Sequence, residues 1–259
     1  MDLGIRGRKA IVCASSAGLG KACAASLARE GCLVIINGRN LERLVETSAE
    51  IQSETGCSVT AIAADLNTER GRAALLDACP DADILVNTNA GPDPGNFAKW
   101  ERADWQRAFE ANFFAPLFMM KALLPGMVHR KFGRIVNITS ARVKSPTPAM
   151  GLSASARTAL TALSKSIALD VASSNVTINN LLPERFETDR QKFMAQQMVR
   201  ADGVSYDEAR AKIAETIAAK RLGQPYEFGD ACAFLCSAQA GYISGQNLQL
   251  DGGSYRGLV

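Results

Sequence analysis

Short apolar runs alternate with longer segments of helical periodicity along the N-terminal half of the chain. Between the first two runs, Leu19, Cys23 and Leu27 recur on one helix face, and Gly31 follows where a left-handed helix cap is expected. Strands that alternate with helices are typical of βαβ units and a parallel sheet. The runs that are short and apolar enough for buried strands lie at residues 10–13, 33–36, 59–62, 84–86, 134–138, 176–178 and 248–250.

The pattern predicts one doubly wound α/β domain of the Rossmann type over residues 1–259, with helices on both faces of a parallel sheet. No internal repeat, low-complexity tract or linker divides the sequence. Residues 184–222 carry a charged helical pattern between two strands and are too long for a plain connection. We expect this segment to form a lid over the carboxyl ends of the strands, where ligands bind in such folds.

Composition narrows the possible partners and locations. The 259 residues carry a formal charge of only +3 without a basic run, which argues against nucleic acid or a membrane surface as partner. The apolar stretches are far shorter than the roughly 20 residues that span a bilayer, so no membrane helix is expected. The first residues lack a secretion signal, and the seven cysteines show no C-x-x-C spacing. These features predict a cytoplasmic protein with reduced thiols.

His129 is the sole histidine, so a metal site with several histidines is excluded and none is predicted. A Ser-His-Asp triad would depend on this one side chain. His129 lies where a basic helix end meets a glycine, which favours a solvent-exposed residue at a helix C-terminus.

A glycine-containing turn follows the first predicted strand and opens a helix. A second strand ends about 20 residues further on, where dinucleotide-binding folds contact the adenosine ribose. Backbone N–H groups at such a helix start can hold a pyrophosphate. The turn residues expected to contact the cofactor are Ser15, Ser16, Gly18, Leu19 and Gly20.

The end of the second strand favours NADP over NAD. An NAD site usually places Asp or Glu there to bind the ribose 2′-hydroxyl, but this chain has Gly38 and Arg39. A guanidinium suits a 2′-phosphate. The alternative for Arg39 is a solvated charge at a strand end.

Together these motifs resemble the short-chain dehydrogenase/reductase family, in the branch of the 3-oxoacyl-acyl-carrier-protein reductases, along nearly the whole chain. The family's T-G-x-x-x-G-x-G motif is present from Cys13 to Gly20 with Ala14 in place of the first glycine. The other matching segments are Ala64-Asp65-Leu66, Asn87-Thr88-Asn89-Ala90-Gly91, Arg221-Leu222-Gly223-Gln224-Pro225 and residues 244–253, which match T-G-Q-x-x-x-V-D-G-G.

The resemblance implies roles for further residues. Asp65 and Leu66 would contact the adenine, and Thr188, five residues after Pro183, would contact the nicotinamide carboxamide. Asn112 matches the family's structural and catalytic asparagine. The resemblance also implies a homotetramer or homodimer. The remaining cofactor contacts it implies are Asn89, Ala90, Gly91, Arg157 and Pro183.

The sequence departs from the family at the reaction centre. The family uses a serine, a tyrosine thirteen residues later and a lysine four further on. Ser140 matches the serine, but Ser153 and Arg157 stand at the other two positions. A phenol whose pKa is lowered by lysine can protonate an alkoxide, whereas a serine hydroxyl is a far weaker acid. Arg157 can stabilise an oxyanion and bind the nicotinamide ribose, but hardly shuttle a proton.

Three other side chains could replace the proton donor. Lys144 lies on the loop after Ser140, where it is either a desolvated acid or a solvated cation. Tyr206 lies in the lid segment, where a helix N-terminus is the simpler interpretation. Glu184 follows Pro183 and would need a raised pKa to donate a proton; a salt bridge to Arg185 or to a lid arginine is the alternative.

The sequence therefore predicts an NADP(H)-dependent oxidoreductase that acts on a carbonyl or alcohol, such as a 3-oxoacyl thioester or another anionic ketone. Ser140 and Arg157 would polarise the oxygen, with Asn112 ordering the site. Two alternatives stay open. One is a nucleotide-binding scaffold or sensor without redox turnover, and the other is a non-redox enzyme that acts on a carbonyl.

Overall fold

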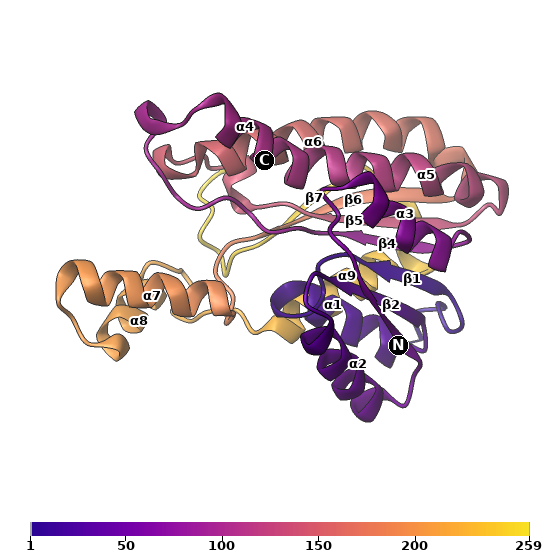
Figure 1. Cartoon of the computed structure of the whole chain (residues 1–259), viewed down its shortest axis with the longest axis horizontal. Coiled ribbons are helices and arrows are strands. Elements are labelled where there is room, and N and C mark those ends of the chain that lie inside the picture. Colours follow the sequence, from indigo (N-terminus) through magenta and orange to yellow (C-terminus); the bar gives the residue numbers. More distant parts are fainter. Residues whose placement is uncertain (1, 259) are drawn as a thin grey trace.

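The computed structural model describes residues 2–258, and within them seven parallel strands form one sheet in the order β3-β2-β1-β4-β5-β6-β7 (Figure 1). The predicted doubly wound sheet is confirmed, and each predicted strand is present with its ends shifted by a few residues. The strands are β1 (Lys9–Val12), β2 (Leu33–Gly38), β3 (Val59–Ala63), β4 (Ile84–Asn87), β5 (Gly133–Ile138), β6 (Val176–Pro183) and β7 (Asn247–Leu250).

Helices cover both faces of the sheet. On one face lie α1 (Gly18–Arg29), α2 (Leu41–Thr55) and α9 (Pro225–Leu235); on the other lie α3 (Glu69–Ala78), α4 (Arg102–Phe109), α5 (Ala115–His129) and α6 (Gly151–Val171) (Figure 1). The strand order reverses at β1, which pairs with β2 on one side and with β4 on the other. Ligands bind at such a reversal, outside the carboxyl ends of the strands.

The first crossover helix forms as the apolar spacing predicts. Cys23 and Leu27 are fully buried in the core on that face, and Gly31 has a φ of +83°, the left-handed conformation that ends the helix. Gly229 of α9 lies against α1, where a Cβ would come within 2.4 Å of the Ala22 carbonyl oxygen. This close approach requires glycine.

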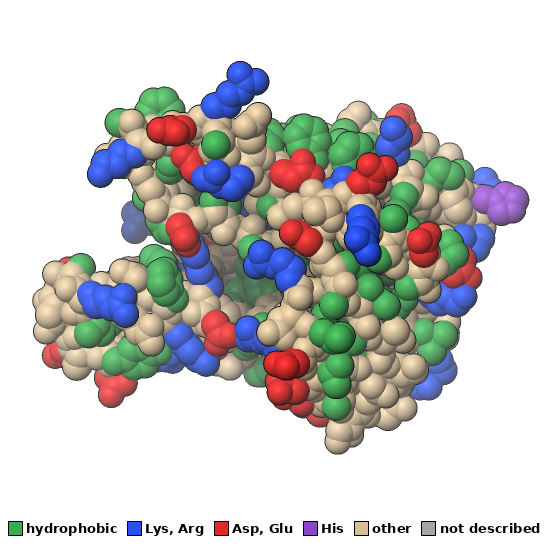
Figure 2. Space-filling view, in the orientation of Figure 1, with side chains coloured by type: hydrophobic (Ala, Val, Ile, Leu, Met, Phe, Trp, Pro, Cys, Tyr) green, Lys and Arg blue, Asp and Glu red, His purple; other side chains and the backbone are tan. Residues whose placement is uncertain are grey.

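One long helical segment, Arg102–His129, is long and apolar enough to cross a membrane by length and composition. It consists of α4, a π-turn called η2 (Glu110–Phe114) and α5. Met119, Met120 and Leu123 of α5 are buried in the core beneath the sheet. We therefore interpret this segment as a core helix. His129 ends it and is exposed, as predicted, at the edge of the molecule (Figure 2).

Two helices, α7 (Asp189–Asp202) and α8 (Tyr206–Glu215), occupy most of the predicted lid segment and project from the body (Figure 1). We call residues 189–215 the arm. Ala195, Ala209 and Ile213 form a small apolar cluster of its own. Two ion pairs at its base reach the body: Asp189 with Arg43 of α2, and Arg190 with Asp93 of the loop after β4, each at 3.0 Å.

The fold of the arm should depend on pH through Glu187. Arg210 of α8 donates two hydrogen bonds to this carboxylate, which lowers the pKa of Glu187 below its ordinary value. The pair therefore stabilises the arm above the ordinary carboxyl pKa of about 4.3, and this contribution is lost as pH falls through the lowered pKa. We expect hydrogen exchange in α8, corrected for intrinsic rates, to rise below about pH 4.

The variant Glu187→Gln supplies the control for this prediction. It should exchange faster than the parent near neutral pH and lose part of the acid-dependent increase. An arm whose exchange shows the same pH dependence in both proteins would mean that other carboxylates control it.

Candidate active site

The turn between β1 and α1 has the features of a phosphate site. The helix begins after Ala17 without a side-chain cap and without an acidic residue in its first turn, so its N-terminal N–H groups are open to an anion. Gly20 packs against the turn, where a Cβ would lie 2.6 Å from the Ala14 carbonyl oxygen. Ala14 itself has a φ of +40°, the region that favours glycine. The turn therefore keeps a glycine-type backbone at Ala14.

Ser15 and Ser16 have different surroundings. Ser15 is fully buried, and its hydroxyl donates to the Val12 carbonyl and accepts from the Asn37 N–H. Its own N–H donates to the Asn37 carbonyl. The structure therefore does not favour the predicted cofactor contact by Ser15, because its polar groups join β1 to β2. Ser16 is half-buried and faces the end of β2, where a Cβ on Gly38 would lie 3.1 Å from its hydroxyl.

Arg39 follows β2 directly and is exposed, and within residues 2–258 it has no carboxylate within ion-pair distance. Arg43, one turn further on, is paired with Asp189. A groove of about 550 Å³ opens beside this region, lined by Ser16, Gly18 and Thr188 among others. A phosphate beside Ser16 would therefore find Arg39 available.

Thr188 and Pro183 bring the base of the arm to the site. Pro183 ends β6, and Thr188 precedes α7, with its methyl group 3.8 Å from the position of a Cβ on Gly18. The segment before the arm thus lies against the phosphate turn.

The loop after β4 is held from two sides. Asn89 accepts a hydrogen bond from the Ala90 N–H at 2.8 Å and donates to Asn67 at 2.9 Å. Asn112 of the π-turn donates to the Ala90 carbonyl at 3.3 Å and to the Ala108 carbonyl at 3.2 Å. The Oδ1 atom of Asn112 is buried without a hydrogen-bond partner among the described residues.

Asp65 and Leu66 follow β3 next to this loop. Asp65 Oδ1 accepts from the Asn67 N–H at 3.0 Å, which fixes the turn, and the Leu66 side chain is buried. Leu66 and Asn89 also line a cavity of about 10 Å³, roughly the size of one water molecule, beneath the site. This cavity is too small to hold a substrate.

The candidate catalytic residues Ser140, Ser153 and Arg157 lie at the end of β5 and on α6. Ser140 follows β5, and its half-buried hydroxyl accepts from the Arg142 N–H at 3.1 Å. Ser153 and Arg157 lie one turn apart on α6, with Arg157 Nε donating to Ser153 Oγ at 3.2 Å. Arg157 Nη1 donates to the carbonyl oxygen of Ile138, the last residue of β5, at 2.8 Å. The guanidinium is thereby fixed beside the strand that leads to Ser140.

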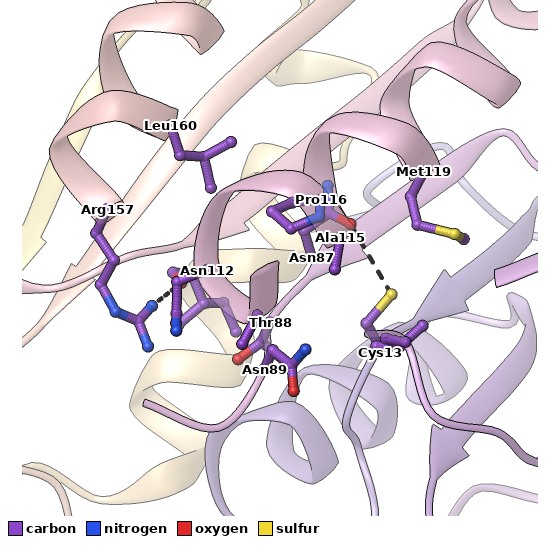
Figure 3. Close-up of a pocket in the computed structure, with 13 residues that line it drawn as sticks. Cys13, Asn87, Thr88, Asn89, Asn112, Ala115, Pro116, Met119, Arg157 and Leu160 are labelled. Atoms are coloured by element: carbon purple, nitrogen blue, oxygen red, sulfur yellow. Dashed lines mark hydrogen bonds between the residues drawn. The ribbon is translucent and has the colours of Figure 1, made fainter. Parts of the chain in front are cut away.

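Arg157 is a buried cation without a carboxylate partner in residues 2–258. Its residue surface is 9% exposed, and burial lowers the pKa of its guanidinium to about 10, so it stays protonated at neutral pH. It reaches from α6 toward Asn112 and the loop after β4 (Figure 3). A Cβ on Gly91 would lie 3.3 Å from Nη2. Arg157 donates hydrogen bonds to Ser153 and Ile138, which leaves other N–H donors of the guanidinium able to bind an oxygen ligand.

The three candidate proton donors, Glu184, Tyr206 and Lys144, have different surroundings in the structure. Glu184 forms the predicted kind of salt bridge, but with Arg142 at 2.5 Å and not with Arg185 or a lid arginine. Tyr206 is the first residue of α8, whose N-terminus is capped by Ser205, as the sequence context suggests. The Tyr206 ring lies beside Arg210. Lys144 is half-buried, with Nζ 5.4 Å from the ring centroid of Tyr255. Tyr255 was not identified from the sequence.

A ladder of asparagines beneath the site was also missed. Asn87 donates to Asn137 at 2.8 Å, Asn137 to Asn180 at 3.3 Å, and Asn180 to Asn247 at 2.8 Å, across β4, β5, β6 and β7. Cys13 donates to Asn87 at its other end (Figure 3). The signal was present, because each of the last four strands contains an asparagine. Their shared register could not be read from spacing along the chain.

The chain is similar along nearly its whole length to several known proteins. A family model described as enoyl-(acyl carrier protein) reductase matches residues 13–255. The NADPH-dependent reductase BacG of Bacillus subtilis is 31% identical over 97% of this chain and 99% of its own. L-sorbose reductase of Gluconobacter frateurii, solved with NADPH and L-sorbose, superposes with a TM-score of 0.95 at 28% identity over 100% of both chains. A 3-oxoacyl (acyl-carrier-protein) reductase of Agrobacterium tumefaciens with NADP bound has a TM-score of 0.87 at 29% identity, covering 97% of this chain and 96% of the other.

Proposed function

Because the chain belongs to the short-chain dehydrogenase/reductase family of oxidoreductases, we propose that it is an NADP(H)-dependent enzyme that interconverts a carbonyl compound and its alcohol. The observation that carries the proposal is the order of groups along the carboxyl edge of the sheet. An open helix N-terminus lies after β1, Arg39 after β2, and Ser140 with Arg157 at the end of β5. A dinucleotide that crosses this edge would end beside Ser140.

Different residues along this edge would hold different parts of the cofactor. The α1 N-terminus holds the pyrophosphate, and Ser16 with Arg39 holds the 2′-phosphate. Asp65, Leu66, Asn89, Ala90 and Gly91 shape the adenosine half, while Pro183 and Thr188 face the nicotinamide half. NADPH supplies a hydride when bound.

The reaction end would act through hydrogen bonds and charge. Ser140 donates to the substrate oxygen, and Arg157 stabilises negative charge there and binds the nicotinamide ribose. Asn112 orders the loop that faces both. Ser153 stands where the family has its tyrosine, and its aliphatic hydroxyl, which accepts from Arg157, is a far weaker acid than a phenol. We therefore assign proton delivery to water or to another side chain at the rim.

We further propose an anionic ketone, such as a 3-oxoacyl thioester, as the substrate class, and a homodimer or homotetramer in the cytoplasm. Arg157 supports the anionic substrate, because it is a positive charge near Ser140 without a carboxylate partner in the described chain, whereas the charge of Arg142 is paired with Glu184.

The seven cysteines, all within residues 2–258, are free thiols, which suits a reducing compartment such as the cytoplasm.

Arg39→Ala should weaken NADPH binding by about 10- to 100-fold, because a charge-assisted hydrogen bond to the 2′-phosphate is lost. NADH, which lacks that phosphate, should bind the parent and the variant equally. Calorimetric titration with both nucleotides measures this. Arg107→Ala, which removes an exposed arginine of α4 paired with Asp104 and away from this groove, is the matched control.

Turnover is tested by following NADPH absorbance with a panel of ketones and thioesters. Substrate-dependent NADPH consumption supports the proposal. Tight NADPH binding without consumption by any compound would favour the redox-inactive alternative, and product formation without absorbance change would favour a non-redox reaction. Failure to bind either nucleotide would remove the basis of the proposal.

A further inference from the structure

Lys144 and Tyr255 meet at the rim of the candidate active site. Lys144 directly follows the short 3-10 turn η3 (Ala141–Val143), which Ser140 caps. Tyr255 comes from the C-terminal segment after β7. Its ring centroid lies 5.4 Å from the Lys144 ammonium, and both side chains are half-buried. A cation over an aromatic face is held there by the ring quadrupole.

The C-terminal turn holds Tyr255 in this position. Asp251 accepts hydrogen bonds from the N–H groups of Tyr255 at 2.7 Å and Gly253 at 2.9 Å. Ser254 Oγ donates to the Asp251 carbonyl at 2.9 Å. Gly257 approaches the phenol so closely that a Cβ there would lie within 2.5 Å of the ring's hydroxyl oxygen. The backbone of Tyr255 is thus fixed by its own segment, and the phenol lies against Gly257.

The charge of Lys144 is not neutralised within the described residues. Its neighbour Arg142 is paired with Glu184 at 2.5 Å, and both of these side chains are largely buried. Lys144 forms no ion pair with a carboxylate of residues 2–258, and an aromatic ring attracts a cation without cancelling its charge. Arg157 is a second cation without a carboxylate partner in the described chain, and it donates to the carbonyl oxygen of Ile138, two residues before Ser140. An anion that binds beside Ser140 would therefore meet positive charge from both residues.

We propose that Lys144 contacts a carboxylate on the substrate and that Tyr255 is the positioning residue that holds Lys144 for this contact. This inference rests on the proposed function and specifies its substrate class as an oxo acid. Lys144 then determines specificity, and Arg157 acts at the carbonyl oxygen. A neutral analogue would lose the contact to the ammonium and would bind more weakly than the acid.

The test uses the full chain saturated with NADP⁺, which cannot donate a hydride, so that binding is measured without turnover. Calorimetry compares oxo acids from pyruvate to 5-oxohexanoate with their methyl esters. At least one acid should bind about tenfold or more tightly than its ester, as expected for a hydrogen bond to a charged group. Lys144→Met should remove this preference, because it keeps the apolar stem and deletes the charge.

Tyr255 variants separate positioning from packing. Tyr255→Phe keeps the aromatic face and should keep the acid preference. Tyr255→Leu keeps an apolar side chain without the quadrupole and should reduce the preference by about two- to fivefold. A preference that survives Lys144→Met, that falls in Tyr255→Phe as far as in Tyr255→Leu, or that is absent for every acid would overturn the inference.

The same titrations without nucleotide keep this inference apart from the proposed function. If NADP⁺ does not bind but oxo acids bind in a Lys144-dependent way, the nucleotide proposal fails and the anion contact stands. If NADP⁺ binds and the acids show no preference over their esters, the anion contact fails and the oxidoreductase proposal stands.

Discussion

Replacing Ser153 by Tyr and Arg157 by Lys in one protein should raise the rate of carbonyl reduction by about 10²- to 10⁴-fold, the usual contribution of a positioned general acid. The two side chains lie one turn apart on α6 and already contact each other, so the new pair would also be adjacent. The lysine would lower the pKa of the phenol, which could then protonate the alkoxide as hydride transfer proceeds. Stopped-flow measurement of NADPH oxidation under single-turnover conditions reports the step directly.

The matched control is Ser153→Phe with Arg157→Lys, which introduces the same ring without its hydroxyl. This variant should show no gain, so any difference between the two doubles belongs to the phenol. Ser153→Tyr alone should gain less, because Arg157 stays protonated and cannot pass on a proton. An unchanged rate in a folded, NADPH-binding Ser153→Tyr/Arg157→Lys protein would show that this edge of the sheet does not perform carbonyl reduction.

Asn137→Leu should destabilise the fold by about 2–6 kcal/mol, although leucine has the same branched shape as asparagine and the same number of side-chain heavy atoms. The substitution removes the amide that Asn87 donates to and that donates to Asn180 and Ser164. Asn137 is fully buried, so Asn87 Nδ2 and Asn180 Oδ1 would lose their partners where water cannot replace them. Each unsatisfied buried group costs about 1–3 kcal/mol. The midpoint of thermal unfolding should fall by about 5–20 °C.

Asn247→Ala provides the comparison at the end of the same ladder. Asn247 is half-buried, so water can reach the Asn180 amide that it leaves behind, and a loss below about 1 kcal/mol is expected. Urea unfolding of both variants gives the two free energies with their slopes. Equal losses at the two positions would contradict the argument from burial.

The fold could be predicted from sequence because its signals are local. The run at 33–36 is apolar and β-branched, and it forms β2 with Val34 and Ile36 buried. The segment from Cys13 to Gly20 was recognised by its position at the start of a helix that follows a strand, and in the structure α1 begins at Gly18 within it. Both predictions were possible because each depends on residues that lie close together in the sequence, within one βα unit.

The rest of the site depends on residues that are far apart in the chain. A salt bridge to Arg185 or to a lid arginine was one of two alternatives for Glu184, but its partner is Arg142, 42 residues away, and no local pattern names it. Lys144 follows β5 and Tyr255 follows β7, so no pattern within one βα unit connects them. Ser15 was expected at the cofactor by its place in the motif, yet its polar groups are used to join two strands. Side-chain direction in a turn is decided by tertiary contacts that spacing does not contain.

The asparagine ladder also restricts how the strands can pair. Asn87, Asn137, Asn180 and Asn247 are direct register partners in β4, β5, β6 and β7. Successive side chains of a strand point to opposite faces, so a slip of β5 by one residue would turn Asn137 away from both neighbours. It would leave three strands with unpaired amides at once. Apolar strands of a parallel sheet can pair in neighbouring registers with similar free energy. The ladder therefore raises the free energy of folding intermediates in which these strands are misaligned.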